Sequence, residues 1–151
     1  RKAKIDFDNL DGSKGYSPMK FYRQSKLSNL LFALELQNRL ERAGVSAISV
    51  ACHPGISATN LLSRGSGKET ARIMKMLMRI VAQSAEDGAL PTLYAATHPD
   101  LRGGEFIGPD GPGNHKGYPV LTNDAARLYK PDLASRLWEV SESLTGVRYT
   151  I

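Results

Sequence analysis

Residues 17–59, SPMKFYRQSKLSNLLFALELQNRLERAGVSAISVACHPGISAT, predict a long helix followed by a buried strand and a turn. Ser17 is a typical N-cap residue, Pro18 suits the first helical position, and Gly44 marks the end of the helix. The helix should therefore run over 18–43. Residues 45–52 are apolar and partly β-branched between a glycine and a proline, which is typical of a strand buried on both faces of a parallel sheet.

Tyr22 and Lys26 lie four residues apart in the segment YRQSK. A helix places residues at this spacing on one face, about 5–6 Å apart. A fixed positive charge beside a phenol favours the phenolate, so the phenol can both donate and accept a proton. The two residues are therefore a candidate catalytic pair, and the alternative is an exposed aromatic residue and a lysine on an ordinary helix.

Other motifs accompany this pair along the chain. Ser25 completes Y-x-x-S-K, and the turn P-G-x-x-x-T follows the predicted strand. Together with SKLSNLLFALEL, VACHPG, EDGALPTLYAAT and RLWEVSE, these motifs resemble the short-chain dehydrogenase/reductase family. The pattern is most similar to the branch that holds retinol dehydrogenases and protochlorophyllide-reductase-like proteins, and it covers nearly the whole chain.

The resemblance implies a role for each motif residue. Tyr22 would be the general acid in carbonyl reduction and the base in alcohol oxidation, and Lys26 would bind the ribose hydroxyls of the nicotinamide cofactor beside it. Pro54 and Gly55 would turn the chain under the nicotinamide, and the backbone of Ile56 would meet the carboxamide.

Thr59 completes this set, because the resemblance places its hydroxyl at the carboxamide or the adjacent phosphate. The cofactor would be NAD or NADP, and the resemblance slightly favours NADP. The charge that distinguishes the two nucleotides is expected in an upstream part of the protein.

Alternating helices and strands predict an α/β protein with a doubly wound parallel sheet of the Rossmann type. The sequence contains no glycine-rich dinucleotide turn between a strand and a helix. We therefore expect residues 1–151 to form the C-terminal half of a single NAD(P)-binding domain. This half should be incomplete and inactive without the N-terminal half, which would also carry the family's catalytic serine.

Residues 68–82 predict an amphipathic helix with a basic stripe and a methionine-rich apolar face. The resemblance places a substrate lid at 60–83, and an apolar lid would suit a lipophilic substrate. The alternative is a solvated basic face over an ordinary core.

Further helices are predicted from Ser84 to about Thr97, with Pro91 kinking the helix or marking an irregular first turn, and from Asn123 and Pro131. A short last strand is predicted at 105–107, so only two strands are predicted in all.

The composition of the chain argues against several classes of function. The net charge of +5 comes from scattered residues and aromatic residues are few, which argues against a nucleic-acid surface. Cys52 is the only cysteine, so neither a disulfide framework nor a thiol-ligated metal site is expected, and His53 is interpreted as structural. No apolar run reaches the roughly 20 residues of a membrane span, and a cytoplasmic location is expected.

These observations predict an NAD(P)-dependent oxidoreductase that acts on a carbonyl or secondary alcohol, with a lipophilic substrate favoured. By resemblance the helix at 18–43 forms a subunit interface through residues that include Phe32, so a homodimer or homotetramer is expected. Two alternatives remain open. One is a catalytically inactive family member that serves as a binding or scaffold module, and the other is a membrane-surface module that uses the basic helix at 68–82.

Overall fold

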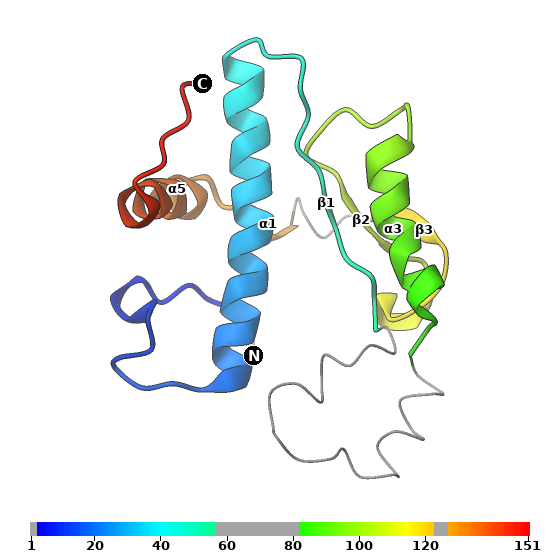
Figure 1. Ribbon diagram of the computed structural model, residues 1–151, viewed down its shortest axis with the longest axis horizontal. Helices are drawn as coiled ribbons and strands as arrows, with labels where there is room; N and C mark the ends of the chain where they lie inside the picture. The colour runs from blue at the N-terminus through cyan, green and yellow to red at the C-terminus, as the bar shows by residue number, and fades with distance from the viewer. Residues whose placement is uncertain (1–2, 57–81, 123–126) are drawn as a thin grey trace. The chain divides into compact units, whose positions relative to one another are not determined.

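The computed structural model describes residues 3–56, 82–122 and 127–151 (Figure 1). The chain divides into two compact units. Unit 2 comprises residues 50–123, and unit 1 comprises the residues before and after it.

Unit 1 is built on the long helix α1, Pro18–Arg42, as the sequence predicts. Its C-cap is followed by Gly44 with a φ of +66°, a conformation that glycine adopts without strain. The Gly44 N–H donates to the Glu41 carbonyl and the Val45 N–H donates to the Leu40 carbonyl. These two bonds form a Schellman motif, which satisfies the last carbonyl groups of the helix.

Helix α5, Pro131–Thr145, packs against α1 (Figure 1). The predicted start at a proline is confirmed, and so is the end at Gly146, which has a φ of +69°. Leucines spaced along one side of α1 form the apolar stripe that this packing requires. The buried cluster consists of Leu27, Leu31, Ala134 and Leu137, with Ile5, Phe7, Tyr129 and Leu133 packed around it.

A buried polar cluster joins α1 to the segment just before α5. Glu35 is only 4% exposed, and its carboxylate accepts hydrogen bonds from Arg39 Nε at 2.9 Å and from the Tyr129 hydroxyl at 3.2 Å. Asn38 Nδ2 donates to the same hydroxyl. Burial, together with the nearby Glu35 carboxylate, raises the pKa of Tyr129. The cluster therefore satisfies a charge that would be costly to bury alone.

Replacing Tyr129 should change how stability depends on pH. Because the pKa of Tyr129 is raised in the folded protein, its contribution is complete below the ordinary value of about 10 and is lost as pH rises through the folded value. We expect Tyr129→Phe to lower the free energy of unfolding at neutral pH by about 1–2 kcal/mol. The difference from the wild type should shrink above about pH 10. Urea denaturation followed by circular dichroism would measure this, with the exposed Tyr118→Phe as control. A difference that is constant with pH would contradict the prediction.

Unit 2 contains a three-stranded sheet in the order β1-β2-β3. The strands are β1 Ala51–Cys52, β2 Phe106–Pro109 and β3 Pro119–Thr122. Strands β1 and β2 are parallel, and β2 and β3 are antiparallel. Helix α3, Ala85–Thr97, contacts all three strands and connects the parallel pair, which makes a β–α–β crossover (Figure 1).

Helix α3 begins as the sequence predicts. The Ser84 hydroxyl accepts a hydrogen bond from the Asp87 N–H at 3.0 Å, so Ser84 is the N-cap. The helix continues through Pro91, whose side chain is fully buried, so the proline does not mark an irregular first turn. Two short 3-10 helices complete the described elements, at Phe7–Asn9 in unit 1 and Pro112–Asn114 in unit 2.

The predicted strand at 45–52 is longer than the observed one. Only Ala51 and Cys52 pair, with Phe106 and Ile107, while residues 45–48 are exposed. β-branched residues favour an extended backbone, but a strand also needs a hydrogen-bonded neighbour. Within the described residues, β2 provides that neighbour only for the last two positions.

The expectation of two strands was also wrong. Strand β3 pairs with β2, and the paired residues run from Phe106 opposite Thr122 to Pro109 opposite Pro119. The described sheet is therefore mixed rather than wholly parallel. Pro109 and Pro119 are paired at the end of the ladder. Proline is tolerated there because the N–H that it lacks is not needed to continue the ladder. The observed β2 lies slightly later than the predicted strand at 105–107.

Several predicted features lie outside the described residues. These are most of the basic helix at 68–82 and of the lid at 60–83, together with Thr59 and the helix start at Asn123.

Candidate active site

Tyr22 and Lys26 lie on one face of α1, as their spacing predicts. Lys26 Nζ lies over the Tyr22 ring, 5.5 Å from its centroid. The Tyr22 side chain is 51% exposed, so its hydroxyl is open to a ligand. The Ser25 hydroxyl donates to the Tyr22 carbonyl at 2.8 Å, so its hydrogen bond is local to the helix.

Met19 extends this exposed face toward the start of the helix. It lies three residues before Tyr22 and is 57% exposed. Residues three and four apart are neighbours on a helix surface. Tyr22 therefore has a cationic neighbour on its C-terminal side, Lys26, and an apolar neighbour on its N-terminal side, Met19.

The turn Pro54-Gly55-Ile56 follows the carboxyl end of β1 in unit 2. Gly55 has a φ of +66°, and a Cβ atom at this position would lie 2.2 Å from the His115 carbonyl oxygen and 2.9 Å from Pro109 Cγ. Both the backbone conformation and the available space therefore require glycine. The structure gives this glycine a reason within the chain itself, in addition to the approach of a cofactor that the sequence suggests.

His53 supports this turn. Its Nδ1 accepts a hydrogen bond from the Gly55 N–H at 3.2 Å, and its ring lies 5.1 Å from the Phe106 ring, centroid to centroid. A Cβ atom at Gly108 would lie 2.2 Å from His53 Nε2, so the ring fills the space beside that glycine. These contacts agree with a structural role. Across the described ranges, no group of histidine, cysteine, aspartate and glutamate side chains could hold a metal ion.

Two residues that sequence reasoning did not single out hold the turn in place. The Ile56 N–H donates to the His115 carbonyl at 2.6 Å, and the Gln83 N–H donates to the Ile56 carbonyl at 2.9 Å. Gln83 Nε2 also donates to the Pro54 carbonyl at 2.7 Å. These contacts join segments about thirty and sixty residues apart, and no local sequence pattern indicates them.

The predicted site residues thus form two groups. Tyr22 and Lys26 belong to unit 1, and Pro54, Gly55 and Ile56 belong to unit 2. The structure brings residues together within each group, and Thr59 is outside the described residues.

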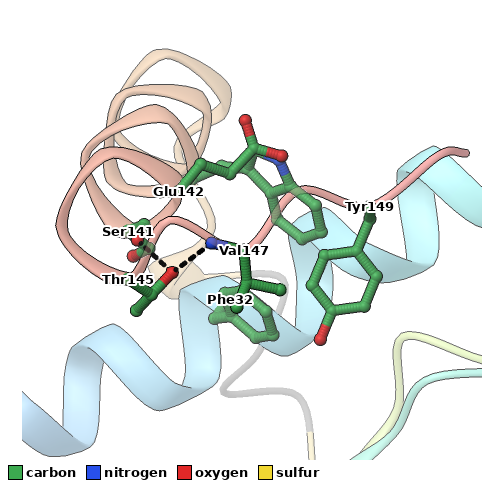
Figure 2. A pocket seen from close by; sticks show the side chains of 7 residues that line it. Phe32, Ser141, Glu142, Thr145, Val147 and Tyr149 are labelled. Atoms are coloured by element: carbon green, nitrogen blue, oxygen red, sulfur yellow. Dashed lines mark hydrogen bonds between the residues drawn. The ribbon is translucent and has the colours of Figure 1, made fainter.

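A cavity of about 250 Å³ lies in unit 1 between α1, α5 and the residues after α5 (Figure 2). None of the predicted site residues lines it. Phe32 stacks on Trp138 there with ring centroids 5.0 Å apart, and the Thr145 hydroxyl binds backbone groups. The lining residues are Phe32, Trp138, Ser141, Glu142, Thr145, Val147 and Tyr149. Phe32, which was expected at a subunit interface, therefore packs partly against residues of its own chain.

Among the helices of the described ranges, none combines the length and the apolar character that a membrane span requires.

Several known proteins are similar to this chain. The short-chain dehydrogenase TIC 32 A, chloroplastic, of Brassica napus is 34% identical over 140 residues, which are 93% of this chain and 41% of that protein. Human retinol dehydrogenase 11 is 33% identical over 145 residues, 96% of this chain and 42% of that protein. The chain therefore spans less than half the length of these two relatives. No protein-family model matches it.

A shorter relative is covered more fully. The short chain dehydrogenase/reductase dpmpH of Macrophomina phaseolina is 30% identical over 149 residues, 91% of this chain and 68% of that protein. A crystal structure of an uncharacterized protein from Mycobacterium paratuberculosis is 34% identical with a TM-score of 0.72, over 98% of this chain and 47% of that one. These relatives confirm the resemblance in the sequence and show that the family is one of enzymes. The retinol dehydrogenases and TIC 32 are among its relatives, and the chain belongs to the short-chain dehydrogenase/reductase family.

Proposed function

We propose that the protein is an NAD(P)-dependent oxidoreductase that transfers hydride between a nicotinamide cofactor and a carbonyl compound or secondary alcohol. The observation that carries the proposal is the Tyr22–Lys26 pair, with the ammonium 5.5 Å from the ring centroid and the phenol half exposed. The names of the relatives, which are dehydrogenases or reductases, support it.

In the reductive direction, a nicotinamide cofactor held here would supply the hydride for the carbonyl carbon as the carbon–oxygen π bond breaks. Tyr22 donates its phenolic proton to the carbonyl oxygen, which becomes the hydroxyl of the product. The Lys26 ammonium, 5.5 Å from the ring centroid, supplies a positive charge beside the tyrosine that has given up its proton. In the oxidative direction, the Tyr22 phenolate accepts the proton from the alcohol.

The residues present fit a nicotinamide nucleotide. In open α/β sheets ligands bind outside the carboxyl ends of parallel strands, and the turn at Pro54 follows such an end of β1. The Lys26 ammonium offers three hydrogen-bond donors for ribose hydroxyls. The Ile56 N–H is already donated to His115, so Ile56 would bind the carboxamide through its carbonyl oxygen, which has a second lone pair. The resemblance adds Thr59 to this set, and NADP is proposed ahead of NAD.

A lipophilic substrate is part of the proposal. Met19 is 57% exposed and lies on the side of Tyr22 away from Lys26. If Lys26 marks the cofactor side, the rest of the substrate extends over Met19. An apolar chain would bury this side chain, whereas a small polar substrate would leave it in water. In a series of aldehydes, kcat/KM should therefore increase with chain length. If kcat/KM did not change with chain length, the proposal of a lipophilic substrate would be wrong.

Replacing Lys26 tests the proposed activity directly. In the full-length protein, Lys26→Met should weaken cofactor binding and lower kcat/KM by about 10- to 100-fold. The absorbance of the reduced nicotinamide measures the rate. Lys20→Met is the matched control, because Lys20 lies on the same helix but binds Asp6 at 2.8 Å. Equal effects of the two variants would remove Lys26 from the mechanism.

The proposal includes a homodimer or homotetramer formed through α1. Light scattering that shows a monomer at micromolar concentration would contradict it.

A further inference from the structure

We infer that Gln83 is a positioning residue that holds the turn Pro54-Gly55-Ile56 in its cofactor-contacting conformation. This inference rests on the function proposed above, in which the turn meets the nicotinamide. It concerns a residue with no role in the chemistry itself, placed 27 residues or more after the turn in the sequence.

Gln83 makes three hydrogen bonds that converge on this region. Its side-chain Nε2 donates to the Pro54 carbonyl at 2.7 Å, and its backbone N–H donates to the Ile56 carbonyl at 2.9 Å. Its side-chain Oε1 accepts a bond from the Gly117 N–H at 3.0 Å. One residue therefore connects the turn to the segment around Gly117.

That second segment holds the turn as well. The carbonyl of His115, two residues before Gly117, accepts the Ile56 N–H at 2.6 Å, and its oxygen fills the space that a side chain at Gly55 would need. Gln83 thus fixes the turn directly through two carbonyl groups. It also fixes it indirectly, because it orients the backbone on which the turn rests.

The chemistry of these contacts selects glutamine. Gln83 is 8% exposed, and buried polar groups must find partners. A primary amide offers a donor and an acceptor at the end of one side chain, which are the two functions required by the Pro54 carbonyl and the Gly117 N–H. A carboxylate offers only acceptors, and an aliphatic side chain offers neither.

If the turn is already ordered before the cofactor binds, less conformational entropy is lost on binding. Binding groups that are already ordered avoid the cost of ordering on association, so affinity is greater. If Gln83 is replaced, the hydrogen bonds from its amide to the Pro54 carbonyl and from the Gly117 N–H to its oxygen are lost, and the turn gains alternative conformations. The loss should therefore appear in cofactor affinity rather than in proton transfer by Tyr22.

The test compares two buried glutamines in the full-length protein. Gln83→Leu removes both side-chain bonds, and Gln83→Glu keeps the size and the acceptor but removes the donor. The control is Gln37→Leu, because Gln37 is 5% exposed and accepts a bond from the Ser49 N–H at 2.7 Å in unit 1. Thermal unfolding, the Kd for NADPH by calorimetry, and the separate kcat and KM values would be measured for each variant.

We expect all three variants to lose stability, and only the Gln83 variants to lose cofactor affinity, by about tenfold or more. The KM for the carbonyl substrate should change little. If Gln83→Leu does not fold, Gln83→Glu carries the test. Cofactor Kd values that change equally in the Gln83 and Gln37 variants would overturn the inference and leave the proposed function standing. A wild-type protein with no nicotinamide-dependent turnover and no NADPH binding would overturn both.

Discussion

Tyr22→Phe should abolish turnover in the full-length protein while leaving cofactor binding nearly unchanged. The substitution removes only the hydroxyl that would give its proton to the carbonyl oxygen, and it keeps the ring over which Lys26 Nζ lies. General acid–base catalysis contributes roughly 10²- to 10⁴-fold, so kcat should fall by about that factor. Single-turnover measurement of hydride transfer, together with calorimetric titration of the cofactor, would separate the two effects.

A neighbouring tyrosine provides the control for this experiment. Tyr16 is 68% exposed and packs on Phe21 with ring centroids 4.9 Å apart, close in sequence to Tyr22. Tyr16→Phe also removes one exposed phenolic hydroxyl, and it should leave kcat unchanged. Substantial turnover in Tyr22→Phe would exclude Tyr22 as the proton donor.

Gly55→Ala should destabilise unit 2 severely, whereas Gly44→Ala should have a small effect. Both glycines have a φ of +66°, so both substitutions carry the same backbone strain, about 1–2 kcal/mol. A Cβ atom at Gly44 meets nothing within 4 Å, but one at Gly55 lies 2.2 Å from a carbonyl oxygen. Overpacking a rigid site adds about 1–3 kcal/mol or more, so the total loss at Gly55 should be roughly 3 kcal/mol or higher.

Urea denaturation followed by circular dichroism would measure both losses. The comparison isolates the steric contact, because φ is +66° at both positions. Equal losses in the two variants would show that His115 moves away at little cost. The contact between His115 and the turn would then not constrain the site.

The helices could be predicted because their signals are local. Pro18, Gly44, Ser84 and Gly146 each mark a helix end through the conformation or hydrogen bonding of that one position. The spacing of Tyr22 and Lys26 is equally local, since a helix alone brings them together. The family resemblance then assigned these residues their expected roles.

The strands could be predicted less well because pairing decides them. The sequence at 45–50 favours an extended backbone, but only Ala51 and Cys52 have a partner in β2. Strand β3 was missed because Pro119 and the glycines before it indicate a loop, and only the ladder with β2 shows otherwise. Predicting this strand therefore requires knowing contacts between residues far apart in the sequence, such as Thr122 and Phe106, which are 16 residues apart.

The support of the turn could not be predicted at all. Gln83 reaches the Pro54 carbonyl across 29 residues and Gly117 across 34 residues. A glutamine has no pattern around it that indicates such partners, because its amide can satisfy either a donor or an acceptor. The residues proposed to contact the cofactor stand out in the sequence, whereas the residue proposed to position them does not.

The surroundings of Trp138 determine what the intrinsic tryptophan fluorescence of this chain reports. It is the only tryptophan in the chain, it is 2% exposed, and it lies between the Phe32 ring at 5.0 Å and the Arg39 guanidinium at 4.5 Å. Shielded from water, its fluorescence emission should lie at shorter wavelength than that of an exposed indole. Because α1 supplies both neighbours and α5 supplies the tryptophan, the intrinsic emission of this chain reports the contact between the two helices and is silent about the sheet of unit 2.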